Sequence, residues 1–339
     1  MSAALASDAF ADGNVSVTLT PEGQDLADSL GIDVGDFQTS LNDKLSDAFD
    51  TFRPKEYLRA VSDAVAFSNR GIGVDYASGS KRFEVGVAGN VSLALGDQGL
   101  GEIDADRPVA GVAPNFSLMV GWNLEEFGYP AVTVFGNGFH HSADIGDFNG
   151  SATNAGAHAQ VRLFRNRGGG NLRKLVFLWG GVDITSGIEY TRLSLSLQNE
   201  IDTKLPIDGN MPLDVLLTSR GKYDLTATAL TLPIEATTSV RAFYFFWLYG
   251  GVGADLQLGG SSVDAQLDGT MVATDPNTQQ EVEVGTATVQ VSEDSGPSIG
   301  KLRFLAGLQA EVLFAKVFVQ ANLLPDRGAG VAFGVRAAF

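Results

Sequence analysis

From Gly71 to its carboxyl terminus, this chain repeats a pattern in which every second residue is apolar. The last segment is the clearest example, because Val331, Phe333 and Val335 alternate with small or charged residues up to the terminal Phe339. Alternation with a period of two is the pattern of a β-strand that has one apolar face. The same pattern fills four further segments, at residues 82–95, 111–124, 157–165 and 301–314. The repetition indicates an all-β body.

These segments are long for strands of a soluble protein. They run for about 10 to 14 residues against the usual five or six, and strands of that length span a bilayer when they are tilted. The longest apolar run, Ala242 to Ala254, is too short for a spanning helix. A soluble β-sandwich would fit the same alternation, but strand length, repetition and the terminal aromatic favour a membrane barrel. Because lipid cannot satisfy an open sheet edge, the barrel must be closed.

The expected fold is therefore a transmembrane antiparallel up-and-down β-barrel spanning residues 71–339. The segmentation predicts about 14 strands, and 12 is the alternative, because single-chain bacterial barrels have even numbers of strands. The predicted strands lie near residues 71–79, 82–96, 109–123, 131–141, 153–165, 172–187, 188–198, 222–240, 241–258, 263–274, 281–292, 299–314, 316–324 and 329–339. If the carboxyl terminus is periplasmic, the connection from Asn199 to Gly221 is extracellular.

The first 68 residues differ from the rest of the chain. Residues 1–19 are small and polar and predict a flexible amino terminus. Residues 20–68 carry apolar side chains at spacings of three and four, the pattern of short amphipathic helices, and Pro54 separates two of them. Their apolar faces need cover. Either this segment is a plug in the lumen or mouth of the barrel, or it is a small periplasmic helical cap or a segment that docks on a partner.

Composition excludes several classes of function. The chain has no cysteine, so it can form neither a disulfide nor a thiolate metal site, and its net charge of −17 argues against nucleic acid as a partner. Adjacent His140 and His141 would point to opposite faces of a strand, so no metal site is predicted. No arrangement of Ser, His and Asp has the spacing of a known catalytic motif. We therefore expect no enzyme activity, no metal and no cofactor.

The residues that face the lumen would determine function. Parity along the strands assigns aromatic side chains to the inner face, namely Phe135, Phe139, Phe177, Trp179, Phe243, Phe245, Trp247 and Tyr249. It also assigns charged side chains there, namely Arg82, Glu84, Arg162, Arg303, Glu311 and Arg336. The aromatic residues predict an apolar path that binds a hydrophobic ligand. Alternatively, they pack against the amino-terminal helices, or part of the set from Phe243 to Tyr249 forms an interfacial girdle.

In architecture the chain resembles the long-chain fatty-acid and aromatic-hydrocarbon transporters of the bacterial outer membrane. Those proteins are barrels of fourteen strands with an amino-terminal helical hatch, and their third strand is kinked. Pro114 lies in the third predicted strand and cannot donate to the ladder, so the resemblance implies a kink there. The Asn-Pro near the mature amino terminus of that family has no counterpart here. The terminal strand ending at Phe339 also resembles the targeting strand of outer-membrane barrels, which implies recognition by the outer-membrane assembly machinery.

The sequence thus predicts a protein of the Gram-negative outer membrane, surrounded by membrane lipids, that moves small hydrophobic molecules such as fatty acids through an aromatic-lined lumen. A narrow, charge-selective porin is one alternative, and a structural or adhesive barrel is another. Ligand in the lumen would favour the first, a continuous wet pore the second, and a lumen filled by side chains the third.

Overall fold

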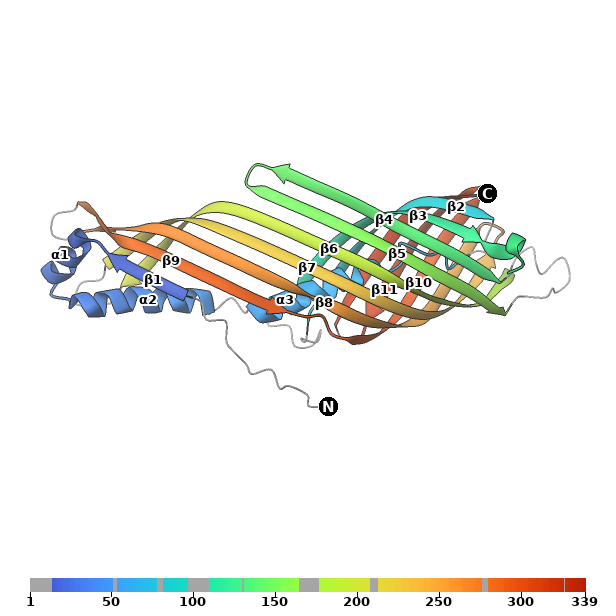
Figure 1. Ribbon diagram of the computed structural model, residues 1–339, viewed down its shortest axis with the longest axis horizontal. Coiled ribbons are helices and arrows are strands. Elements are labelled where there is room, and N and C mark those ends of the chain that lie inside the picture. Colours follow the sequence, from blue (N-terminus) through green and yellow to red (C-terminus); the bar gives the residue numbers. More distant parts are fainter. Residues whose placement is uncertain are drawn as a thin grey trace.

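The computed structural model describes residues 14–50, 54–77, 82–96, 110–129, 131–164, 177–207, 213–275, 280–325 and 327–339 (Figure 1). One antiparallel sheet contains all twelve strands of the described residues. The strands are β1 (Asn14–Leu19), β2 (Phe83–Ala94), β3 (Gly111–Asn123), β4 (Val132–Ile145), β5 (Phe148–Phe164), β6 (Phe177–Ile207), β7 (Leu213–Ala242), β8 (Phe246–Thr274), β9 (Glu281–Ser295), β10 (Gly300–Val312), β11 (Ala315–Leu324) and β12 (Gly328–Ala338). The helices are α1 (Pro21–Ser29), α2 (Val34–Asp50), α3 (Pro54–Phe67) and the short 3₁₀ helix η1 (Leu124–Phe127). No helix in these described ranges is long and apolar enough to cross a membrane.

The sheet closes into a ring of ten strands. Strand β12 pairs with β2, and β8 pairs with both β7 and β10, so β2 to β8 and β10 to β12 form the circle. All of these pairings are antiparallel, which confirms the expected closed barrel. For the barrel, about fourteen strands were expected, with twelve as the alternative, and the ring has ten. Predicted strands 172–187 and 188–198 both fall in β6, and predicted strands 241–258 and 263–274 both fall in β8. Strand β9 lies outside the ring, and predicted strand 71–79 has no strand in its described part, residues 71–77.

The outer face of the ring is apolar. In β3, side chains alternate without exception between buried and exposed, and the exposed ones include Phe116, Leu118 and Val120. In β12, Val331 and Phe333 are exposed in the same way. A soluble protein would turn such a face inward, whereas a barrel in lipid exposes it. The closed ring and this apolar exterior make the protein a β-barrel of the outer-membrane type.

Three strands continue far beyond the ring. Strands β6, β7 and β8 are 31, 30 and 29 residues long, and their distal halves pair with one another. Strand β9 adds to the distal half of β8, and β1 adds to β9. We call this part, together with α1 and α2, the extension; it projects from the end of the ring opposite the carboxyl terminus (Figure 1).

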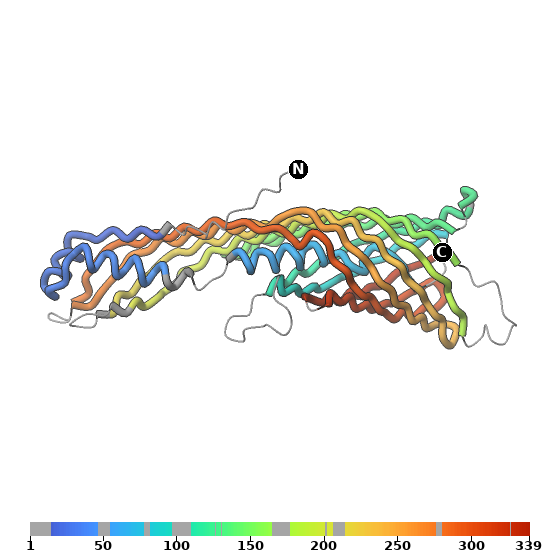
Figure 2. Tube along the Cα trace, turned by 90° about the horizontal axis from the view of Figure 1, so that it is seen from below, coloured from blue at the N-terminus to red at the C-terminus, as the bar shows by residue number. Residues whose placement is uncertain are grey.

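Helices line one side of the curved extension (Figure 2). Phe37, Leu41 and Leu45 of α2 lie one turn apart and are buried against the sheet, in a cluster with Leu205 of β6 and Leu217 of β7. The spacing of four residues places all three side chains on one helix face. The same cluster includes residues of β1, β8, β9 and α1, so the sheet and the helices share one apolar core.

Helix α3 leads the chain into the ring. It packs on a second apolar cluster that includes Leu193 and Leu225, and it lies so close to β3 that a Cβ on Gly111 would stand 2.2 Å from the backbone of Ala60. Only glycine permits that approach. Every residue from Ala60 to Ala77 is buried, and the part after α3 has no regular structure. We call residues 54–77 the plug.

The wall of the ring has one incomplete seam. Strand β3 pairs with β4 only between residues 118–123 and 133–138, so Gly111–Ser117 has no partner in β4. Pro114 lies in this unpaired stretch. On the edge of β3 that faces β2, the expected kink is absent, because the pairing with β2 runs through Pro114 without a register shift. The Phe116 carbonyl, two residues on, points toward the seam and accepts from Asn154. By the alternation of a strand, Pro114 also turns its nitrogen to the seam, where no donor is required.

Candidate functional site: a filled lumen and an external trough

Two groups of ion pairs fix the plug to the wall of the ring, and a separate buried pair joins Asp63 of α3 to Lys301 of β10 at 2.7 Å. In the first group, Arg70 of the plug pairs with Glu189 of β6 and, at 3.4 Å, with Asp255 of β8. Arg303 of β10 joins the same group, because its Nε donates to Asp255 at 3.0 Å and its guanidinium also pairs with Glu235 of β7. The carboxylates come from three neighbouring strands, so this one group of charges connects several strands of the wall to the plug.

The second group lies on the next strands along the ring, β11, β12 and β2. Asp75 of the plug accepts from Lys316 of β11 at 2.7 Å and lies 3.3 Å from Arg336 of β12. Lys316 also pairs with Glu84 of β2. All these side chains are buried. A buried charge is costly unless it is paired, and here each carboxylate of the group has a cationic partner.

The irregular backbone of the plug is also satisfied by the wall. Asn90 donates to the Arg70 carbonyl at 2.5 Å, Gln160 donates to the Asp75 carbonyl at 3.1 Å, and Arg336 donates to the Val74 carbonyl at 2.6 Å. Buried carbonyls need such partners, and a segment without regular structure cannot supply them itself. The lumen is therefore occupied by a segment whose charges and backbone both match the wall.

Three of the predicted lumen aromatics lie on the inner face and contact this plug. Phe135, Trp247 and Tyr249 are buried in one cluster with Val74 and Tyr76. The rings of Tyr76 and Tyr249 are stacked, with centroids 5.9 Å apart. These aromatic residues pack against the irregular part of the plug after α3, whereas the second interpretation of the inner face had them packing against the amino-terminal helices.

The other predicted lumen aromatics require correction. Phe177 and Trp179 are 61% and 44% exposed on the outer face, because the register of β6 against β7 shifts between Trp179 and Gly181. Such a bulge adds one residue, and one residue reverses the face of every side chain before it. Phe243 and Phe245 lie in the turn between β7 and β8 and are 59% and 41% exposed.

Phe139 is half-buried, and its ring contacts Phe116 with centroids 4.9 Å apart. Phe139 belongs to the inner face of β4, whereas Phe116 belongs to the lipid-facing side of β3. Beyond the last paired residue, β4 is therefore displaced outward from β3. Inside the seam, Asn154 of β5 bonds to Asn115 at 2.5 Å and to Ser117 at 2.9 Å. Polar side chains thus close the seam where backbone pairing is missing.

The predicted charged residues divide in a similar way. Glu84, Arg303 and Arg336 are buried in the ion pairs described above. Arg162 is half-buried and pairs with Asp183 at 2.8 Å. Arg82 was assigned to the lumen, but its side chain is exposed just before β2, at the rim of the ring. Glu311 is half-buried near the end of β10, where its N–H donates to the Phe245 carbonyl.

Sequence reasoning missed the plug side of these pairs. Arg70 and Asp75 lie beside and within the predicted strand 71–79, so neither was assigned to the lumen. Lys316, Glu189 and Glu235 were not named either. The signal that could have found them is parity, because Glu189, Glu235 and Lys316 are charged residues at inward positions of their strands.

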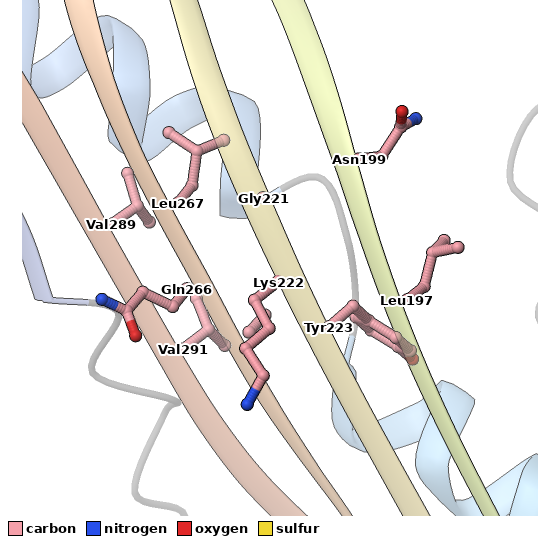
Figure 3. Close-up of a pocket in the computed structure, with 10 residues that line it drawn as sticks. Leu197, Asn199, Gly221, Lys222, Tyr223, Gln266, Leu267, Val289 and Val291 are labelled. Carbon is pink, nitrogen blue, oxygen red and sulfur yellow. The ribbon is translucent and has the colours of Figure 1, made fainter. Parts of the chain in front are cut away.

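A second feature lies outside the ring, on the concave face of the extension, which we call the trough. Between the parts covered by α2 and α3, the trough contains a cavity of about 220 Å³ (Figure 3). Strands β6 to β9 line it with Leu197, Asn199, Gly221, Lys222, Tyr223, Ala265, Gln266, Leu267, Val289 and Val291. Burial and the neighbouring Tyr57 raise the pKa of the Tyr223 hydroxyl well above its ordinary value, so this lining group stays neutral.

Comparison with solved structures finds outer-membrane barrels of low overall similarity. The translocator domain of the autotransporter NalP from Neisseria meningitidis has a TM-score of 0.34 and 12% identity, over 88% of this chain and 97% of that one. The outer membrane protease OmpT from Escherichia coli has a TM-score of 0.34 and 9% identity, over 76% and 96%. The toluene transporter TbuX from Ralstonia pickettii has a TM-score of 0.28 and 8% identity, over 84% and 99%. These likenesses carry no argument about function.

Comparison with curated protein sequences finds no match. Comparison with protein-family models finds one family, described as Lsa36-like, whose model matches residues 15–339. The matched range runs from β1 through the plug to the last residue of the chain, so it includes the extension, the trough and the ring. The chain therefore belongs to the Lsa36-like family.

Proposed function

We propose that this protein is a closed outer-membrane barrel that anchors the extension outside the cell, where the extension binds a partner. The observation that carries this proposal is the filled lumen. Buried side chains of the plug and the wall occupy the ring, and ion pairs hold the plug on both sides. A ring closed in this way serves as an anchor rather than as a water-filled pore.

The placement of the extension outside the cell rests on the two ends of the barrel. Bacterial barrels have short periplasmic turns and longer extracellular segments. At the carboxyl-terminal end of the ring, β7 and β8 are joined by Phe243–Phe245, and β10 and β11 by Leu313 and Phe314. The long strands of β6 to β9 leave from the other end (Figure 1). The extension is accordingly the extracellular part, and the carboxyl terminus is periplasmic.

The surface of the extension supports a partner with a basic surface. Among the side chains that the structure describes in the extension, the exposed cationic ones are Lys204, Arg220 and Lys222. Its exposed acidic side chains are Glu22, Asp25, Asp28, Asp33, Asp36, Asp43, Glu200, Asp202, Asp214, Asp264, Asp268, Glu281, Glu283 and Asp294. This excess of negative charge attracts positively charged macromolecules over a distance set by the salt concentration.

A second candidate function is the movement of small hydrophobic molecules. The observation that favours it is the incomplete seam between β3 and β4, because an unpaired stretch of wall needs little backbone rearrangement to widen. In this alternative the plug stays in place, and the hydrophobic molecule leaves sideways through the seam rather than along the axis of the ring.

Proteoliposomes distinguish these possibilities in one experiment. Vesicles that contain the protein are tested for release of potassium ions, for swelling in sucrose, and for uptake of a fluorescent long-chain fatty acid, with an open porin as positive control. The anchor function predicts that none of the three exceeds the rate of protein-free vesicles. Fatty-acid uptake without ion release would select the second candidate. Ion release and swelling together would contradict both.

A further inference from the structure

The trough is mostly apolar, with polar side chains such as Asn199 and Ser219 among its residues, but described helices cover only its two ends. Near the ring, Leu193, Leu225 and Val263 are buried beneath α3. At the far end, Leu205, Leu217 and Met271 are buried beneath α1 and α2. The 220 Å³ cavity occupies the stretch between these covers (Figure 3). It is smaller than the usual pocket for a drug-sized ligand, which suits a slender chain.

The rim of this cavity exposes large apolar side chains. Leu197 lies on the lip and is 45% exposed. Its partner in the neighbouring strand is Phe148, which is 38% exposed, and the partner of Phe148 is Ile145, which is 72% exposed. Directly paired residues share a face of the sheet, so all three belong to the same concave face as the cavity. Exposed apolar patches of this kind mark interaction sites.

This apolar strip continues to the lipid-facing wall of the ring. From Ile145, the same face of β4 leads back to His141 and Phe139, whose rings are stacked with centroids 6.3 Å apart. Phe139 in turn contacts Phe116 on the outer face of β3, at the seam. A row of mostly apolar and aromatic side chains, which includes Ala143 and His141, therefore leads from the surface that faces the bilayer to the cavity in the extension.

We propose that the trough cavity binds a single hydrocarbon chain, which reaches it from the outer leaflet along this strip. The chain fills the uncovered apolar stretch, and the Asn199 amide at the lip faces the more polar end of the ligand. The continuity of the strip with the membrane surface is what identifies the occupant as an acyl chain. This site does not depend on either function proposed above, because it lies outside the lumen and requires no passage through the ring.

Photolabelling tests the site directly. Full-length protein in lipid nanodiscs is exposed to palmitic acid carrying a diazirine near its methyl end, or to a phospholipid with the same diazirine on one acyl chain, and labelled peptides are identified by mass spectrometry. The expected result is labelling of peptides that contain the cavity residues of β6 to β9. The two probes distinguish a free fatty acid from a membrane lipid as the source of the chain.

Matched variants make the result decisive. Ala265→Phe and Val291→Phe each fill the cavity from a different strand, and each should abolish labelling there. Thr286→Phe adds the same ring at an exposed position of β9 outside the cavity and should leave labelling unchanged. Heat-modifiable migration on gels verifies that each variant is folded. Labelling that is confined to the lipid-facing strands, or that persists in both folded cavity variants, would overturn the proposal.

Discussion

Arg70 illustrates how a charged side chain is kept inside this ring. Its guanidinium is 1% exposed and contacts two carboxylates from different strands. Removing one member of a buried pair leaves the other uncompensated, and the cost of that isolated charge exceeds the original gain from pairing. Arg70 therefore affects stability mainly because its removal would leave buried carboxylates without a cationic partner.

The Arg70→Ala variant should accordingly be strongly destabilised, by about 3–5 kcal/mol, because Glu189 would remain buried without its nearest cation. The matched control is Arg220→Ala, which breaks an ion pair whose two side chains are each 75% exposed. Screening by water limits that change to within about 1 kcal/mol. Thermal unfolding followed by gel migration in detergent measures both. Equal losses of stability in the two variants would contradict a stabilising role for the buried ion pairs of Arg70.

Single residues also explain where sequence reasoning about the site failed. Alternation placed Trp247, Tyr249 and Phe135 on the inner face because no bulge interrupts their part of the ladder. It misplaced Phe177 and Trp179 because strict alternation was continued through Gly180 and Gly181, although glycine inside a strand often marks a bulge and Gly181 has a φ of 108°. The contacts of Arg70 and Asp75 could not be predicted, because they join positions far apart along the chain.

At the scale of whole elements, β6 has an edge without a partner. Its pairing with β5 ends at Leu197, so from Asn199 to Ile207 it pairs only with β7 among the described strands. The Gln198 N–H donates to Asp147 on the side of β5. By alternation, the N–H groups of Glu200, Asp202 and Lys204 point to the same side, where none of the described strands pairs with them. Charged side chains commonly protect such an edge against pairing with other chains.

The triple variant Glu200→Val, Asp202→Val and Lys204→Val should therefore self-associate, because it removes this protection and leaves the backbone donors open. The control variant replaces Asp264, Gln266 and Asp268 of β8 with valine. These three residues are equally exposed, but both edges of their strand are already paired. Sedimentation velocity in detergent compares the two. Association of both variants to the same extent would assign the effect to hydrophobicity alone.

Elements also differ in how far the sequence predicts them. The alternating pattern identified the strands of the ring, and the spacing of Phe37, Leu41 and Leu45 identified a helix. The extension was not predicted as one sheet, because periodicity continues through β6 and gives no sign of where the membrane ends. Residues 71–77 also resemble a strand locally, yet the ring already closes between β12 and β2 and offers them no edge.

At the scale of the whole molecule, the barrel presents two unlike ends. One end carries the extension, and the other carries the short turns and Phe339 (Figure 1). Exposed acidic residues concentrate in the extension, whereas many of the basic residues of the ring are buried in the lumen. The two ends differ because only one of them carries long strands that continue beyond the ring.

Single cysteines test this orientation cleanly, because the chain has none of its own. Thr286→Cys in the extension should react with a membrane-impermeant maleimide on intact cells. Leu313→Cys, in the short turn between β10 and β11, should react only after the outer membrane is opened. Both positions are exposed, so a failure to react cannot be assigned to burial within the protein. The opposite labelling pattern would place the extension in the periplasm.

The route of the plug has a consequence for biogenesis. The chain enters the ring from the side of the extension, crosses the lumen through Ala77, and begins β2 at the other end, where Phe83 and Phe339 exchange backbone hydrogen bonds (Figure 2). If the barrel closed first, the plug could enter it only if the part of the chain that precedes the plug passed through the lumen. The hydrogen bonds between β12 and β2 should therefore form last, after the plug has taken its position between the strands.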